Sequence, residues 1–92
     1  MPRYMVERTF PEGFVVSAGS EGRKLLQSII ACNADRSVLW IHSYVSVSQR
    51  KTFCVYEAPS PESIRLTAAS NGLPVDRISE VSLLDPFAYH VS

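Results

Sequence analysis

The sequence predicts one α+β domain whose strands and helices follow the order β-α-β-β-α-β. Three observations favour this order. The chain has 92 residues, a length typical of a single domain, residues 1–92. Four segments alternate between side-chain types as strands do, and two longer segments show helical spacing or helical end signals. Two halves of similar length meet at a hairpin, which indicates a duplicated strand–helix–strand arrangement.

The first predicted strand spans Arg3 to Phe10 and ends at the turn residues 11–13. One face of this strand carries Met5, Glu7 and Thr9, and the other carries Tyr4, Val6, Arg8 and Phe10. A helix follows and runs to about Asn33, with Ser17 or Ser20 as its cap. Its apolar stripe consists of Leu25, Leu26, Ile29 and Ile30. Cys32 lies beside the stripe and is interpreted as a small core residue.

Two strands, about Ser37 to Val47 and Thr52 to Glu57, form the hairpin around a turn at residues 48–50. In the first of them, Leu39, Ile41 and Val45 alternate with Trp40, His42 and Tyr44. In the second, Phe53 and Val55 alternate with Cys54 and Tyr56. Each strand therefore has two distinct faces.

A second helix is predicted after Ser60, which fits the cap position. Pro61 suits the first helical position, and Glu62 lies at the positive end of the helix dipole. Asn71-Gly72 is a typical helix end. The last strand, about 77–84, precedes a tail of residues 85–92 that is expected to form a short extra strand or a subunit contact.

This order is that of the ferredoxin-like fold, an antiparallel sheet with two helices on one face. The face beneath the helices is expected to take the aliphatic residues Val6, Leu39, Ile41, Val45, Phe53, Val55, Val81 and Leu83. The uncovered face would carry Met5, Glu7, Trp40, His42, Tyr44, Cys54, Tyr56 and Glu80. Because this second set is rich in aromatic residues, we expect a homodimer to cover it.

A metal site is predicted on the uncovered face. If the hairpin turn has three residues, 47–49, His42 faces Cys54 and their Cβ atoms lie about 5 Å apart. A turn of two residues would place them on opposite faces. Glu7 approaches Cys54 from the first strand, and Tyr44 and Tyr56 lie nearby. Imidazole, thiolate and carboxylate suit nickel, zinc or copper.

Composition excludes several partners. Nine Lys and Arg residues balance nine Asp and Glu residues, which argues against binding to nucleic acid or an anionic membrane. No apolar run is long enough to cross a membrane, and the charged N-terminus is unlike a signal peptide. We therefore expect a cytoplasmic protein with two free thiols, Cys32 and Cys54.

Three segments resemble a family of small proteins common in actinobacteria: MPRYMVERTF, WIHSYVS…RKTFCVYEAPSPE and NGLPVDRISEV. The resemblance covers most of the chain. Most members of the family are domains of unknown function, and the best-described member is a dimeric, nickel-binding and nickel-responsive protein with a ferredoxin-like fold. The resemblance implies nickel sequestration or metal response. The candidate ligands that it implies are His42, Tyr44, Cys54, Tyr56 and Glu7.

Two other functions stay open. The first is a small dimeric enzyme of the α/β-barrel type, an isomerase or a monooxygenase, with His42 as a base in an enclosed pocket on the sheet and Tyr44 or Tyr56 as an acid. The second is a structural or regulatory interaction module without a small ligand. We favour the metal-binding protein over both, and so do not expect catalysis.

Overall fold

The computed structural model describes residues 1–13 and 19–87 of the chain. Its elements follow the predicted order β-α-β-β-α-β. The strands are β1 (Arg3–Thr9), β2 (Leu39–Val45), β3 (Lys51–Glu57) and β4 (Arg77–Val81). The helices are α1 (Ser20–Ala34) and α2 (Pro61–Asn71). The predicted ferredoxin-like α+β fold is confirmed.

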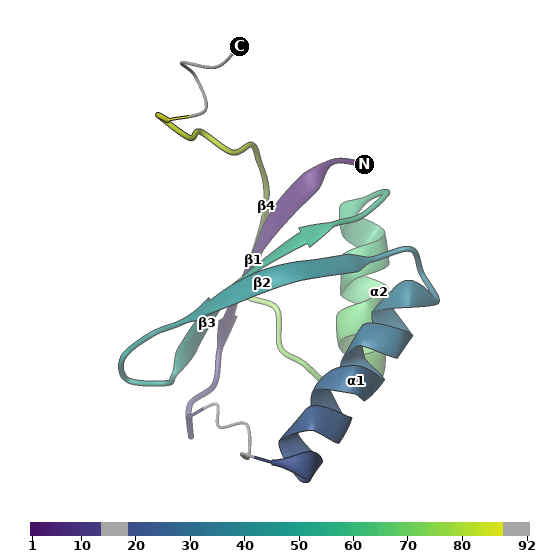
Figure 1. Cartoon of the computed structure of the whole chain (residues 1–92), viewed down its shortest axis with the longest axis vertical. Helices are drawn as coiled ribbons and strands as arrows, with labels where there is room; N and C mark the ends of the chain where they lie inside the picture. Colours follow the sequence, from purple (N-terminus) through teal and green to yellow (C-terminus); the bar gives the residue numbers. More distant parts are fainter. Residues whose placement is uncertain (14–18, 88–92) are drawn as a thin grey trace.

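The four strands form one antiparallel sheet in the order β2-β3-β1-β4. Both helices lie on the same side of this sheet, as Figure 1 shows, and they contact each other. The opposite side of the sheet has no helix. The chain leaves β4 away from the helices; residues 82–87 form no strand, and the rest of the predicted extra strand, 88–92, lies outside the described residues.

The ends of α2 confirm the sequence signals. Ser60 is the cap, and its hydroxyl accepts a hydrogen bond from the Ser63 amide at 3.3 Å. Gly72 ends the helix in the left-handed conformation, at φ 68° and ψ 30°. The predicted cap of α1 is wrong. Gly19 holds that position, at φ 87°, without a side-chain cap, because this backbone conformation favours glycine over serine. Ser17 lies outside the described residues.

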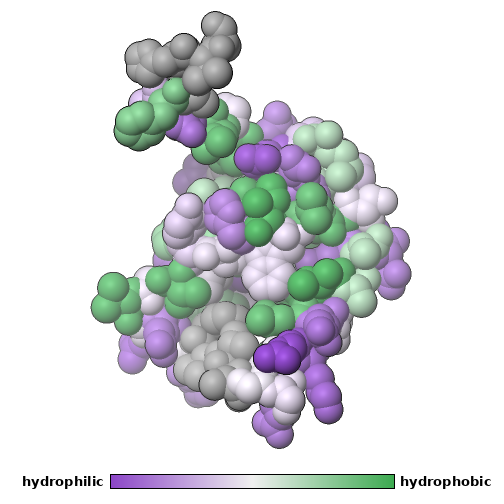
Figure 2. Space-filling view, in the orientation of Figure 1, coloured by the Kyte–Doolittle hydropathy of each residue, from purple (hydrophilic) through white to green (hydrophobic). Residues whose placement is uncertain are grey.

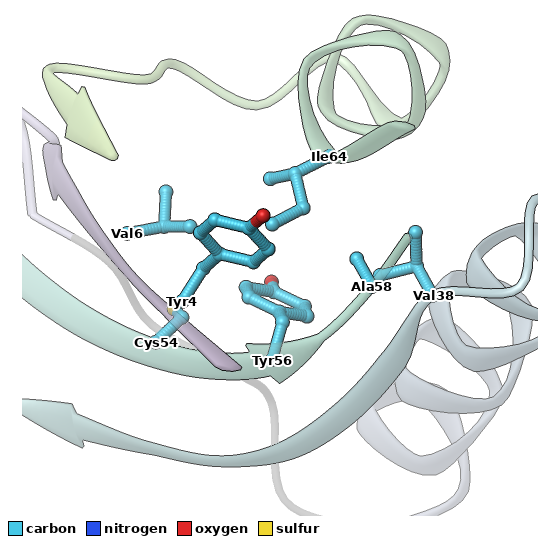
Figure 3. Packing of buried hydrophobic residues seen from close by; sticks show 7 residues of the cluster. All are labelled: Tyr4, Val6, Val38, Cys54, Tyr56, Ala58 and Ile64. Carbon is cyan, nitrogen blue, oxygen red and sulfur yellow. The ribbon is translucent and has the colours of Figure 1, made fainter. Parts of the chain in front are cut away.

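The core lies between the sheet and the helices. Figure 3 shows tyrosine rings and aliphatic side chains from β1 and β3 facing α2. Its buried members are Tyr4, Val6, Val38, Cys54, Tyr56, Ala58 and Ile64. The stripe of α1 is only partly covered, since Leu25 and Ile30 are exposed and Cys32 is half-buried. The apolar side chains that the helices bury in the core, Ile64 and Ala68, therefore lie on α2.

The predicted faces of β3 are reversed. Val6 pairs with Cys54 and both are buried beneath the helices, so Phe53 and Val55 lie on the uncovered side. Leu39 and Val81 occupy that side as well, and Leu83 borders it, while Glu80 pairs with Tyr4 on the helix side. Both faces of β3 carry apolar or aromatic side chains, so alternation could not orient it. The pairing with β1 sets the orientation, because it places Cys54 beside Val6.

A β-bulge in β2 changes the register of the hairpin. Trp40 pairs with Tyr56, yet His42 pairs with Val55, which leaves Ile41 as the extra residue. Trp40 therefore lies on the helix side and His42 on the uncovered side. The turn spans four residues, 47–50, and is bounded by a hydrogen bond of 2.9 Å from the Ser46 amide to the Lys51 carbonyl. The expected three-residue turn is wrong.

Candidate functional site

A shallow groove crosses the uncovered face of the sheet. Its volume is about 270 Å³, and its lining residues are Arg3, Met5, His42, Tyr44, Val55, Val81, Ser82 and Leu83. His42 is exposed and contacts Tyr44 edge to face, with ring centroids 5.2 Å apart. The groove is therefore open to solvent. Over residues 1–13 and 19–87, His42 does not lie in the enclosed pocket that was expected for an enzyme.

The strand register fixes what surrounds His42. His42 pairs with Val55, and Val55 pairs with Met5, so the imidazole and the thioether lie in one row across three strands. Two strand spacings separate them, about 10 Å between backbones. The thioether of Met5 is thus a soft ligand in the same groove. The side chains of Met5 and His42 would have to extend toward each other to share a metal.

Glu7 lies on the predicted face, one row away from His42. Tyr44 pairs with Phe53, and Phe53 pairs with Glu7. The carboxylate of Glu7 approaches Lys51, with Oε1 and Nζ 3.5 Å apart. The ammonium group of Lys51 also lies 5.6 Å from the centroid of the Phe53 ring. Glu7 is therefore engaged by a cation.

Cys54 and Tyr56 lie on the other side of the sheet from His42, which corrects the predicted site. Cys54 pairs with Ser43, is buried, and donates its thiol hydrogen to Thr52 Oγ1 at 3.7 Å. The four-residue turn is the physical reason, because one residue more than expected between Ser46 and Lys51 pairs His42 with Val55 and places it on the opposite face from Cys54. In residues 1–13 and 19–87, no three His, Cys, Asp or Glu side chains gather as a metal site.

The interior contains a charged group that the sequence interpretation missed. Arg8 is 3% exposed; it donates hydrogen bonds to Tyr56 Oη at 3.1 Å and to the Pro74 carbonyl at 2.7 Å. Burial raises the pKa of Tyr56, and the positive charge of Arg8 opposes that rise. The signal was present in the sequence, since Arg8 alternates with Tyr4 and Val6 on one face of β1.

Most of the chain matches a known protein family. The profile of a family described as nickel-responsive proteins like SCO4226 matches residues 4–81. This chain belongs to that family. The resemblance inferred from the three sequence segments is confirmed.

The crystal structure of SCO4226 from Streptomyces coelicolor A3(2) is similar to this family member, with a TM-score of 0.69. The similarity covers 90% of this chain and 99% of SCO4226, at 20% sequence identity, and it shows the fold. No curated protein matches the chain. Over the described residues, neither helix has the length and apolar character to cross a membrane.

Proposed function

We propose that this protein binds nickel, or a similar divalent metal such as zinc or copper, through His42 on the uncovered face of the sheet. The observation that carries the proposal is an exposed imidazole in a groove on the side without helices. Neutral imidazole is a good ligand for these borderline metals. Membership of a nickel-responsive family supports nickel as the metal, and sequestration or metal response as the role.

A homodimer is part of this proposal. One subunit supplies a single imidazole to the groove, and two-fold symmetry would bring a second His42 to the same interface. Exposed apolar side chains favour such contact: Tyr44 is 61% exposed and Leu83 is 73% exposed. Figure 2 shows further hydrophobic side chains in the segment after β4, where Leu84 and Phe87 are exposed. A second copy of this face is the partner that suits this patch.

Tyr44 and Glu7 are the remaining candidates for the metal site. Tyr44 already contacts the imidazole, and Glu7 would exchange its ion pair with Lys51 for the metal. Cys54 and Tyr56 are not part of the proposed site, because the sheet backbone separates them from His42.

Nickel titration calorimetry on four proteins tests the proposal. We expect His42→Ala to abolish nickel binding, because it removes the imidazole that lines the groove. Cys54→Ser and His90→Ala, which changes the other histidine of the chain, should keep the affinity of the wild type. An unchanged affinity in His42→Ala would exclude this site, and a loss in Cys54→Ser would indicate an interior one.

A further inference from the structure

The interior holds a positive charge for which residues 1–13 and 19–87 supply no counter-ion. Arg8 is 3% exposed, and its guanidinium group carries a positive charge. The ion pairs found across the described residues are Arg3–Glu57, Lys51–Glu7 and Arg65–Glu62, and none of them includes Arg8. An unpaired buried charge is strongly unfavourable. An anion bound beside Arg8 would therefore stabilise the folded protein.

The two acceptors that Arg8 contacts are both neutral. One is the Pro74 carbonyl and the other is the hydroxyl of Tyr56. Burial raises the pKa of Tyr56 more than Arg8 lowers it, so the phenol stays protonated at neutral pH and does not balance the charge.

Within the described part of the chain, two buried donors also lack an acceptor. They are Nε of Arg8 and Nδ2 of Asn33, a side chain that is 2% exposed. The Oδ1 atom of Asn33 is already occupied, since it accepts a hydrogen bond from Asn71 at 3.4 Å. Buried N–H groups without acceptors are rare in folded proteins and call for a ligand or water. Both of these groups can only donate.

Space for a ligand adjoins Arg8. A cavity of about 40 Å³ lies between the sheet and the helices, with Arg8 in a lining that is otherwise largely apolar. Its apolar walls come from Phe10, Ile29, Trp40 and Leu73. Asn33 is not among its lining residues, and the region that Asn33 shares with Arg8 is too narrow for a water molecule. The cavity beside Arg8 exceeds the space that one water molecule needs.

We propose that the cavity beside Arg8 binds a small carboxylate, with the guanidinium of Arg8 as the charged donor. A guanidinium recognises the planar carboxylate through parallel hydrogen bonds, and the apolar walls suit a methyl group. The chemistry is therefore that of formate or acetate, not of a bulky or polyvalent anion. The site lies across the sheet from His42, so it is independent of the proposed metal site.

A nuclear magnetic resonance titration of the full chain tests this site. Formate, acetate and nitrate, a planar anion of similar size, are each added at constant ionic strength. We expect the Arg8 Nε–H resonance to shift and to saturate with one dissociation constant. Arg8→Gln should weaken binding about ten- to hundredfold, the range for a charge-assisted hydrogen bond. Arg3→Gln, on the opposite face, should leave it unchanged.

Each outcome decides the proposal. Saturable shifts that are strongest for formate or acetate support a carboxylate site, and stronger binding of nitrate or the absence of any shift overturns it. Saturable binding that survives in a folded Arg8→Gln places the anion elsewhere and also overturns it. If Arg8→Gln does not fold, the Arg8 resonance of the wild type still gives the answer. His42→Ala should keep carboxylate binding, which separates this test from that of the metal.

Discussion

Ile64 is one of the largest fully buried side chains of this small core, so its truncation should be strongly destabilising. It is 2% exposed and points from α2 toward the tyrosine rings of the sheet (Figure 3). We expect Ile64→Ala to lower the free energy of unfolding by about 3 kcal/mol and Ile64→Val by about 1 kcal/mol, because truncation leaves a cavity. Urea denaturation measures both. Leu66→Ala, at an exposed position of the same helix, should change the free energy of unfolding by less than about 0.5 kcal/mol. Equal losses at both positions would contradict this packing.

Ionisation of Tyr56 should make the free energy of unfolding decrease at high pH. Burial raises the pKa of this phenol above its usual value of 10.0. The unfolded chain therefore loses the proton first as the pH rises. We expect the free energy of unfolding to hold steady with respect to this group below about pH 10 and to fall above it. Denaturant unfolding across this range, compared between wild type and Tyr56→Phe, measures the effect. An equally steep fall in the variant would rule out Tyr56 as its source.

At the scale of elements, the C-terminal end of α2 depends on one backbone conformation. A Cβ atom on Gly72 would meet no atom within 4 Å, yet the residue has φ 68°. Gly72→Ala should therefore destabilise the protein by about 1 kcal/mol through the left-handed backbone alone. Gly72→Asn should cost less, because asparagine tolerates this conformation. Thermal unfolding of both variants checks the ranking, and an alanine variant as stable as wild type would contradict it.

The hairpin shows which elements the sequence can define. Alternation located β2 and β3 and the helix signals located α2, because these patterns depend on neighbouring residues. The bulge at Ile41 and the four-residue turn were not predictable, since a single extra residue leaves no change in composition. His42 and Glu7 were placed on the correct face, whereas Cys54 was not. The error lies in register, which is set by partners on other strands.

For the whole molecule, the uncovered face predicts self-association. Tyr44 lies 61% exposed on the side of the sheet opposite both helices. We expect wild type to be a dimer and Tyr44→Asp to be a monomer, because a charge at the centre of an apolar contact stays unpaired. Size-exclusion chromatography with light scattering measures the mass. Leu66→Asp, on the exposed side of α2, should leave the dimer intact, and its dissociation would place the interface on the helices instead.

Metal binding and association are linked if both use this face. A ligand that binds the dimer more tightly than the monomer stabilises the dimer. Nickel should therefore lower the protein concentration at which wild type dissociates, and this shift should vanish in His42→Ala. The monomeric Tyr44→Asp should bind nickel more weakly than wild type although it keeps His42, since one subunit offers a single imidazole there. A nickel-bound monomer of undiminished affinity would show instead that one subunit holds the metal alone.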